Sequence, residues 1–153
     1  MPAWIALTAS DITAALRAPE VDALRTAALA DDQDDPLQGD LDAITARVRA
    51  KVASRSGNRL DVDPTLLPPE LKLDAVWLVI EALKLRLGDA VPLSEDQRER
   101  VRAANRNLDA VARGEFRVST PDNPEGEPTM QSSGGVASSS PTRVATRSTL
   151  SAL

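Results

Sequence analysis

The chain has 153 residues, a formal net charge of −5, and charged side chains at 27% of its positions. This length suits one domain, and the negative balance argues against broad affinity for nucleic acid phosphates. The chain has neither cysteine nor histidine, which excludes disulfides, thiolate metal sites, cysteine nucleophiles and histidine general bases together.

The distribution of apolar and aromatic residues indicates which kinds of segment to expect. The N-terminus has no basic region followed by a long apolar run, so we expect no signal peptide. Because no window of about 18 uninterrupted apolar residues occurs, we also expect no membrane span and no membrane partner. The three aromatic residues, Trp4, Trp77 and Phe116, leave an aliphatic core and little for base stacking.

The first half of the chain predicts three helices. Thr8 and Asp11 have the spacing of a capping box, and a short helix with Ile12 and Leu16 on its apolar face follows. A second helix is expected from Pro19 to about Leu29. The third runs from about Pro36 to Ser56, with a stop signal at Gly57-Asn58. Its apolar stripe is Leu37, Leu41, Ile44, Val48 and Val52.

An acidic run, Asp31-Asp32-Gln33-Asp34-Asp35, separates the second and third helices. Its carboxylates suit a hard cation, but the glycine and the distal glutamate of a calcium loop are missing. We therefore predict no metal site here, and interpret the run as a loop whose last residue caps the helix that Pro36 opens.

Basic residues gather toward the end of the third helix: Arg47, Arg49, Lys51, Arg55 and Arg59. One interpretation is a solvated helix end, where cations are favoured by the helix dipole. The other is a contact with a phosphate backbone or an acidic partner.

The most apolar segment, residues 67–88, predicts the central helix of a small bundle. Pro69 suits its first position and Gly88 the left-handed residue past its end. At about 100° per residue, the apolar side chains cover most of the circumference. They are Leu71, Leu73, Ala75, Val76, Leu78, Val79, Ile80, Ala82, Leu83, Leu85 and Leu87.

One polar stripe remains on this helix: Glu70, Asp74, Glu81 and Lys84. Trp77 lies in the middle of the stripe, on the side away from the core. Either its own N-terminal segment with Trp4 covers it, or it contacts a neighbouring subunit.

A final helix is predicted from the capping box Ser94-Glu95-Asp96-Gln97 to about Arg113, where Gly114 ends it. Its thin apolar stripe suits the edge of a bundle. Another face carries an arginine line: Arg98, Arg102, Arg106 and Arg113. The alternation in residues 115–118 predicts one short strand.

From Ser119 onward, Ser, Thr, Pro and Gly make up more than half of the residues, too polar a composition to bury a core. We therefore predict a helical domain over residues 1–118 and a tail over 119–153 that is disordered or ordered by a partner. The end of the tail is β-prone and suits either a docking strand or a plain flexible end. Its candidate docking residues are Thr142, Arg143, Val144, Ala145, Thr146, Arg147 and Leu150.

Catalytic and cofactor motifs are missing from the sequence. It has no glycine-rich phosphate loop, no HExxH and no GxSxG. Its carboxylates all fall on predicted polar faces or caps, so none is marked as a general acid or base. We predict no enzyme activity and no cofactor, which leaves binding and structural roles.

Three segments, in their order along the chain, resemble a known family. They are the helix start Leu7–Ile12 (LTASDI), the entry Leu67–Val76 (LPPELKLDAV) into the central helix, and the close Ala103–Phe116 (AANRNLDAVARGEF) of the last helix. Together they are similar to the head–tail adaptor (connector, head-completion) proteins of tailed bacteriophages, the Mu-like group in particular. The resemblance covers roughly residues 4–118. One departure is that this chain has no tyrosine, whereas the family often has tyrosines in its central helix.

The resemblance implies a small helical bundle that assembles beneath the portal vertex of the capsid as a ring of about twelve copies, held by heterologous contacts. The protein would be made in the bacterial host cytoplasm and then reside in the virion neck. Its expected partners are itself, the portal protein and a downstream neck (stopper) or tail protein. DNA would pass through the channel without sequence-specific binding, and the tail would dock in the portal.

For the contact between subunits, we expect the stripe of Glu70, Asp74 and Glu81 with Trp77 to face the arginine line of the adjacent copy. Two other functions remain open. One is a small helical nucleic-acid-binding or regulatory module that uses residues 47–59 and 98–113, although no helix-turn-helix is recognisable. The other is a different neck protein, a stopper or tail-completion protein, a class often richer in β-structure.

Overall fold

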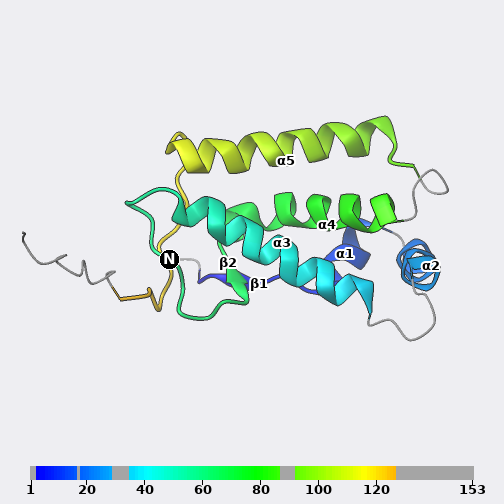
Figure 1. Cartoon of the computed structure of the whole chain (residues 1–153), viewed down its shortest axis with the longest axis horizontal. Coiled ribbons are helices and arrows are strands. Elements are labelled where there is room, and N and C mark those ends of the chain that lie inside the picture. The colour runs from blue at the N-terminus through cyan, green and yellow to red at the C-terminus, as the bar shows by residue number, and fades with distance from the viewer. Residues whose placement is uncertain (1–2, 17, 29–34, 87–91, 127–153) are drawn as a thin grey trace, which may run out of the picture.

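A computed structural model describes residues 3–16, 18–28, 35–86 and 92–126 of the chain. The fold is mainly helical, as predicted (Figure 1). In chain order its elements are β1 (Ile5–Ala6), α1 (Ala9–Ala15), α2 (Ala18–Ala28), α3 (Pro36–Ala53), β2 (Leu66–Leu67), the 3-10 turn η1 (Pro69–Leu71), α4 (Lys72–Arg86) and α5 (Glu95–Arg113).

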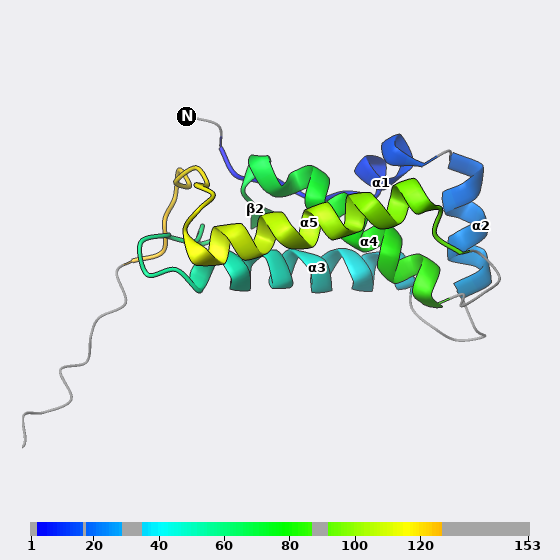
Figure 2. The ribbon, with the colours of Figure 1, turned by 90° about the horizontal axis from the view of Figure 1, so that it is seen from above.

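The three long helices, α3, α4 and α5, form the body of the molecule and pack against one another (Figure 1). Helix α2 crosses one end of this bundle, and α1 lies beside it (Figure 2). Both short helices contact α4, which also contacts α3 and α5. Helix α4 is therefore the central element that the sequence predicts.

The helix starts follow the predicted capping chemistry. Asp35 accepts a hydrogen bond from the backbone N–H of Leu37 (3.0 Å), and Pro36 is the first residue of α3. Capping boxes open α1 at Thr8 and α5 at Ser94. Helix α3 ends at Ala53, about one turn before the predicted stop.

Seven of the apolar side chains predicted to be buried along the central segment lie in the core: Leu71, Ala75, Val76, Leu78, Val79, Ile80 and Leu83. The prediction is wrong for Leu73 and Leu85, which are 60% and 69% exposed. The neighbouring helices do not cover these two positions of α4. Leu87 and Gly88 lie outside the described residues.

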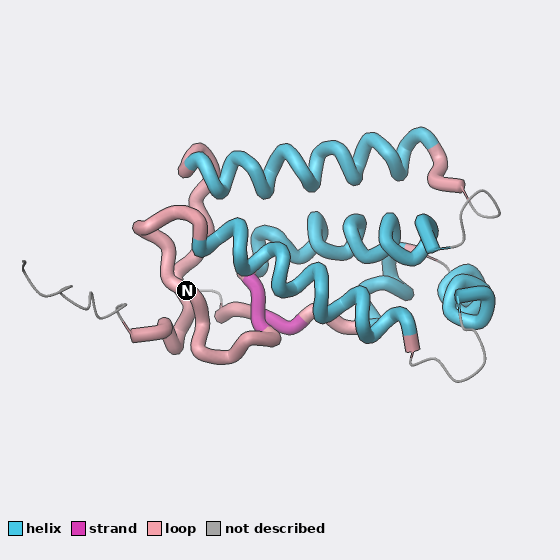
Figure 3. Tube along the Cα trace, in the orientation of Figure 1, coloured by secondary structure: helices cyan, strands magenta, loops and turns pink. Residues whose placement is uncertain are grey.

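The predicted strand at residues 115–118 is wrong, and this segment is a loop (Figure 3). Gly114 takes a left-handed conformation with φ of 79°. The N–H groups of Glu115 and Phe116 then donate to the carbonyl of Ala110 (2.9 and 3.2 Å), so they complete the end of α5 instead of a sheet. The strands that do form were not predicted: Ile5 pairs with Leu67 and Ala6 with Leu66, antiparallel.

Ordered packing continues past the predicted domain boundary at residue 118. The N–H of Val62 donates to the carbonyl of Asn123 (2.9 Å), and that of Glu125 donates to the carbonyl of Leu60 (2.8 Å). The connector before β2 thus holds residues 119–126 against the domain. The predicted docking segment, Thr142 to Leu150, lies outside the described residues.

Candidate functional site

The polar stripe of α4 contains a carboxylate that contacts α5 of the same chain. Asp74 accepts hydrogen bonds from the side-chain amide of Asn107, at 3.2 Å to Oδ1 and 3.1 Å to Oδ2. Burial raises the pKa of Asp74, and the hydrogen bond from Asn107 opposes this shift. Asp74 is therefore part of the helix contact inside one subunit.

Trp77 is half-buried and packs against the core. The guanidinium of Arg100, on α5, lies over its ring at 5.0 Å from the centroid, within the range of a cation–π contact. Its Nε1–H is buried and has no acceptor among the described residues. Trp4, the cover that the sequence suggested, donates its own Nε1–H to the carbonyl of Ser119 (3.0 Å).

The ends of the stripe also contact their own chain. Glu70 accepts hydrogen bonds from the N–H and the hydroxyl of Ser119 (both 3.2 Å). Lys84 is only 5% exposed and contacts Gln97 of α5 (3.0 Å) and Glu20 of α2 (3.3 Å). Glu81 is half-buried.

These placements change the predicted contact between subunits. Helix α5 of the same chain contacts Asp74 and Trp77, so this part of the stripe is engaged inside one subunit. The contact of the stripe with a neighbour's arginine line stays a prediction. The sequence did not predict that Asn107 contacts Asp74 or that Arg100 covers the ring of Trp77. The position of Trp77 in a polar stripe could have indicated that another element covers it. A tryptophan on a polar face is favoured where a cation or another side chain packs on its ring.

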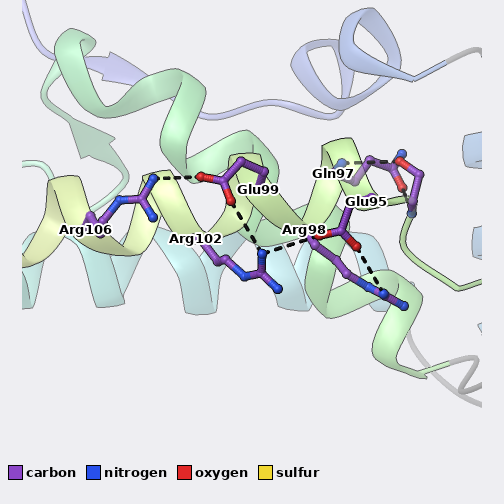
Figure 4. A network of polar contacts seen from close by, with 7 residues as sticks. Glu95, Gln97, Arg98, Glu99, Arg102 and Arg106 are labelled. Atoms are coloured by element: carbon purple, nitrogen blue, oxygen red, sulfur yellow. Dashed lines mark hydrogen bonds and ion pairs between the residues drawn. The ribbon is translucent and has the colours of Figure 1, made fainter.

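The arginine line of α5 is exposed. The side chains of Arg98, Arg102 and Arg106 are 51%, 58% and 64% exposed. They alternate with Glu95 and Glu99 along one face of the helix (Figure 4). Arg102 bridges both glutamates at 3.4 and 3.5 Å, and Arg106 contacts Glu99 at 2.9 Å. Among the described residues, the ion pairs of Arg98, Arg102 and Arg106 are all with glutamates of α5 itself, and the outer side of this face is exposed.

The end of the line has its own ion pair. Arg113 contacts Glu115, just past the helix, at 2.9 Å. The pKa of Glu115 is lowered by this hydrogen bond and charge. In the same way Arg106, and to a lesser extent Arg102, lower the pKa of Glu99. The outer face of α5 and the residue that follows it thus carry a row of paired arginines and glutamates.

The basic residues of α3 have a different environment. Arg49 is 7% exposed, and its guanidinium donates to the carbonyls of Asp61 (2.7 Å), Asp63 (2.9 Å) and Leu66 (2.9 Å). It also lies 5.7 Å from the centroid of the Trp4 ring and 3.6 Å from Glu125. This side chain holds the connector that leads into β2.

Three more cations of this cluster contact α5 or the residue that follows it. Arg47 donates to Asn105 (2.8 Å), Lys51 pairs with Asp109 (2.7 Å), and Arg55 donates to the carbonyl of Gly114 (3.0 Å). Most of the cluster is therefore engaged inside the fold, which weakens its interpretation as a surface for a phosphate backbone.

Among residues 3–16, 18–28, 35–86 and 92–126, no three side chains of the metal-ligating types gather into a possible metal site. Over the same ranges, the helices are too short or too polar to cross a bilayer. Comparisons with protein families, with curated proteins and with solved structures each found no match to this chain.

Proposed function

We propose that the protein is a structural head–tail adaptor of a tailed phage or prophage. In this proposal it is not an enzyme. It assembles as a ring under the portal in the virion neck, extends the DNA channel and docks the next neck or tail component. The proposal starts from the resemblance of three sequence segments and is supported by how those segments meet in the fold.

The observation that carries the proposal is a set of contacts among the three segments. Lys72, from the entry to α4, forms a 2.7 Å ion pair with Asp11 of the α1 capping box. Both are residues of the family-like motifs, and they lie 61 positions apart in the sequence. The fold thus brings two of the family-like segments into direct contact.

The other two segments also meet. Asp74, near the end of the α4 entry motif, accepts the hydrogen bonds of Asn107 in the α5 motif. Leu71 and Ala75 of α4 and Leu108 and Val111 of α5 all belong to one hydrophobic core. The three segments form one structural unit, as expected if they were selected together as an adaptor domain.

The outer face of α5 suits a contact between subunits. Its exposed ion pairs contribute little to folding because water screens them, but charges of this kind can set the register between subunits. A ring requires that this face meet a different surface of the next copy. We propose the arginine line, without Asp74 and Trp77, as part of that contact.

Electron microscopy of the full chain mixed with its portal tests the proposal. We expect a ring at the narrow end of the portal with the wild type, and loss of the ring with Arg102→Glu/Arg106→Glu. The Arg102→Lys/Arg106→Lys variant keeps the charge and should retain the ring. Circular dichroism checks that each variant is folded.

The outcomes separate two claims. No ring with the wild type would overturn the adaptor proposal. A ring that survives the double charge reversal would remove α5 from the interface but leave the adaptor function. The mainly helical fold favours an adaptor over a stopper or tail-completion protein. Salt-sensitive binding of plain duplex DNA by the isolated protein would instead support the nucleic-acid-binding alternative.

A further inference from the structure

A basic pocket lies at the end of the bundle where α3 ends and the chain leaves α5. Its volume is about 330 Å³, and its polar lining is Arg55, Asn58, Arg59, Arg117, Ser119 and Thr120. The described residues that line it include three arginines and no carboxylate. This concentration of positive charge stands out in a chain with a net charge of −5.

The pocket is held by the fold. Arg55 is half-buried, and its Nη1 donates to the carbonyl of Gly114. Ser119 is fixed by its hydrogen bonds to Glu70. Arg117 is exposed, and no hydrogen bond or ion pair joins it to any other described residue. An anion that enters the pocket therefore meets one guanidinium already oriented by the backbone and a second with its donors available.

A run of acidic residues, opposite in charge to the pocket, precedes the other end of α3. The run Asp31-Asp32-Gln33-Asp34-Asp35 ends at the N-cap of α3, whereas Arg55 lies two residues past Ala53, the last residue of that helix. Helix α3 has 18 residues and so is about 27 Å long. Its start and its end lie at opposite ends of the molecule in Figure 1.

The run cannot reach the pocket of its own chain. A fully extended chain spans at most about 3.6 Å per residue, so Asp31 lies within about 14 Å of Asp35. This is roughly half the length of α3. Any contact between the two must therefore join different copies.

We propose that the basic pocket binds the acidic run Asp31–Asp35 of a neighbouring copy. The contact is heterologous, because one end of a subunit meets the opposite end of the next, and such contacts build a ring when the rotation between copies closes. The inference rests on the proposed ring assembly and names a contact that this assembly would use. The charges guide approach and register, as complementary patches do at other interfaces.

A peptide assay tests the pocket without requiring a ring. A fluorescently labelled peptide of residues 28–37 is titrated with the full-length protein, and its anisotropy is measured. We expect saturable binding that weakens with salt and falls about tenfold or more with Arg117→Glu. The same peptide with its four aspartates replaced by asparagine should not bind.

Arg102→Glu is the matched control, because it makes the same charge change at an exposed arginine away from the pocket. It should leave peptide binding unchanged. Failure of the wild type to bind the peptide, equal binding of the asparagine peptide, or an equal loss with Arg102→Glu would each overturn the inference. Displacement of the peptide by inorganic phosphate or a short DNA duplex at lower concentration would also overturn it and indicate a phosphate site.

A charge exchange extends the test to assembly. Arg117→Glu and Asp32→Arg should each reduce ring formation on portals, and an equimolar mixture of the two variants should recover part of it. Wild-type rings that form without peptide binding and are insensitive to Arg117→Glu would refute this inference alone. Peptide binding without any ring on portals would refute the proposed function alone.

Discussion

The cations of α3 and the arginine line of α5 occur on neighbouring helices and look alike in the sequence, yet their roles in the fold differ. Arg49 is 7% exposed and donates to three backbone carbonyls. Arg102 has a side chain that is 58% exposed, and its two ion pairs are with glutamates of its own helix. The first holds the fold together, and the second is free to contact another molecule.

The difference has a physical cause. A buried guanidinium is tolerated only where its donors find acceptors, so Arg49 lies where the connector turns three carbonyls toward α3. An exposed guanidinium keeps its hydration, so its ion pairs contribute little to stability. We therefore expect Arg49 to contribute to the stability of the fold, and the exposed arginine line of α5 to contact another molecule.

The strongest test of this comparison is Arg49→Ala. The substitution removes the guanidinium that donates to the carbonyls of Asp61, Asp63 and Leu66, and we expect the free energy of unfolding to fall by about 3 kcal/mol. Urea unfolding followed by circular dichroism measures it. Arg102→Ala is the matched control and should leave the unfolding midpoint unchanged; equal losses in the two variants would contradict the comparison.

A second test concerns the turn at Gly114, whose carbonyl accepts a hydrogen bond from Arg55. In Gly114→Ala, the new Cβ would lie 2.7 Å from the Arg55 Cζ, and φ at this position is +79°. The guanidinium would have to move away from the carbonyl of Gly114, and this shift with the left-handed strain of a non-glycine residue should cost about 1–3 kcal/mol, mostly from the strain. Thermal unfolding measures the effect.

Gly39→Ala is the control for this test. Gly39 lies inside α3, and no heavy atom lies within 4 Å of the position of its Cβ. Alanine should stabilise the helix there by about 0.5–1 kcal/mol. If Gly114→Ala costs no stability, neither the left-handed conformation of Gly114 nor its contact with Arg55 constrains this turn.

The smallest effect is expected at Asp74 of α4, whose carboxylate contacts Asn107 of α5. Burial raises its pKa from the ordinary value of 3.8, so the folded state binds this proton more tightly than the unfolded state. The group therefore lowers stability as the pH rises from 3.8 through the folded pKa. Asp74→Asn should stabilise the protein at pH 7 by less than about 1 kcal/mol, after solvent screening, and the gain should vanish at low pH.

Urea unfolding of wild type and variant over a pH series measures this difference. Asp109→Asn is the control of opposite sign, because the hydrogen bond and charge of Lys51 lower the pKa of Asp109. That substitution should destabilise the protein at neutral pH and lose its effect as the pH falls. Parallel pH profiles for the two variants would contradict the burial of Asp74.

Much of the fold could be predicted because its signals are local. The caps at Thr8, Asp35 and Ser94 depend on side chains that bond to backbone groups two or three residues away. The stripe of α3 from Leu37 to Val52 is buried as its helical period predicts. The strand pair of Ile5–Ala6 with Leu66–Leu67 was not predictable in this way, because each strand has two residues and its partner lies far along the chain.

The candidate site was less predictable, because it depends on which faces meet. The sequence marked the polar stripe of α4 and the arginine line of α5 as unusual, but it did not show that α5 covers Trp77 within one subunit. It also did not bring Arg55 together with Arg117, since these side chains are separated by two helices. Only the packing of α3 beside α5 creates the basic pocket.

By itself the sequence determined the helical class, most helix boundaries, the aliphatic core and the absence of cysteine and histidine chemistry. These follow from composition and from interactions within a few residues. The tertiary structure decided which charges are buried and which are exposed. Arg49 is buried and donates to three backbone carbonyls, whereas the side chain of Arg102 is exposed to solvent. The physical reason is that the cost of desolvating a charge depends on its surroundings, and distant segments supply those surroundings only when the chain has folded.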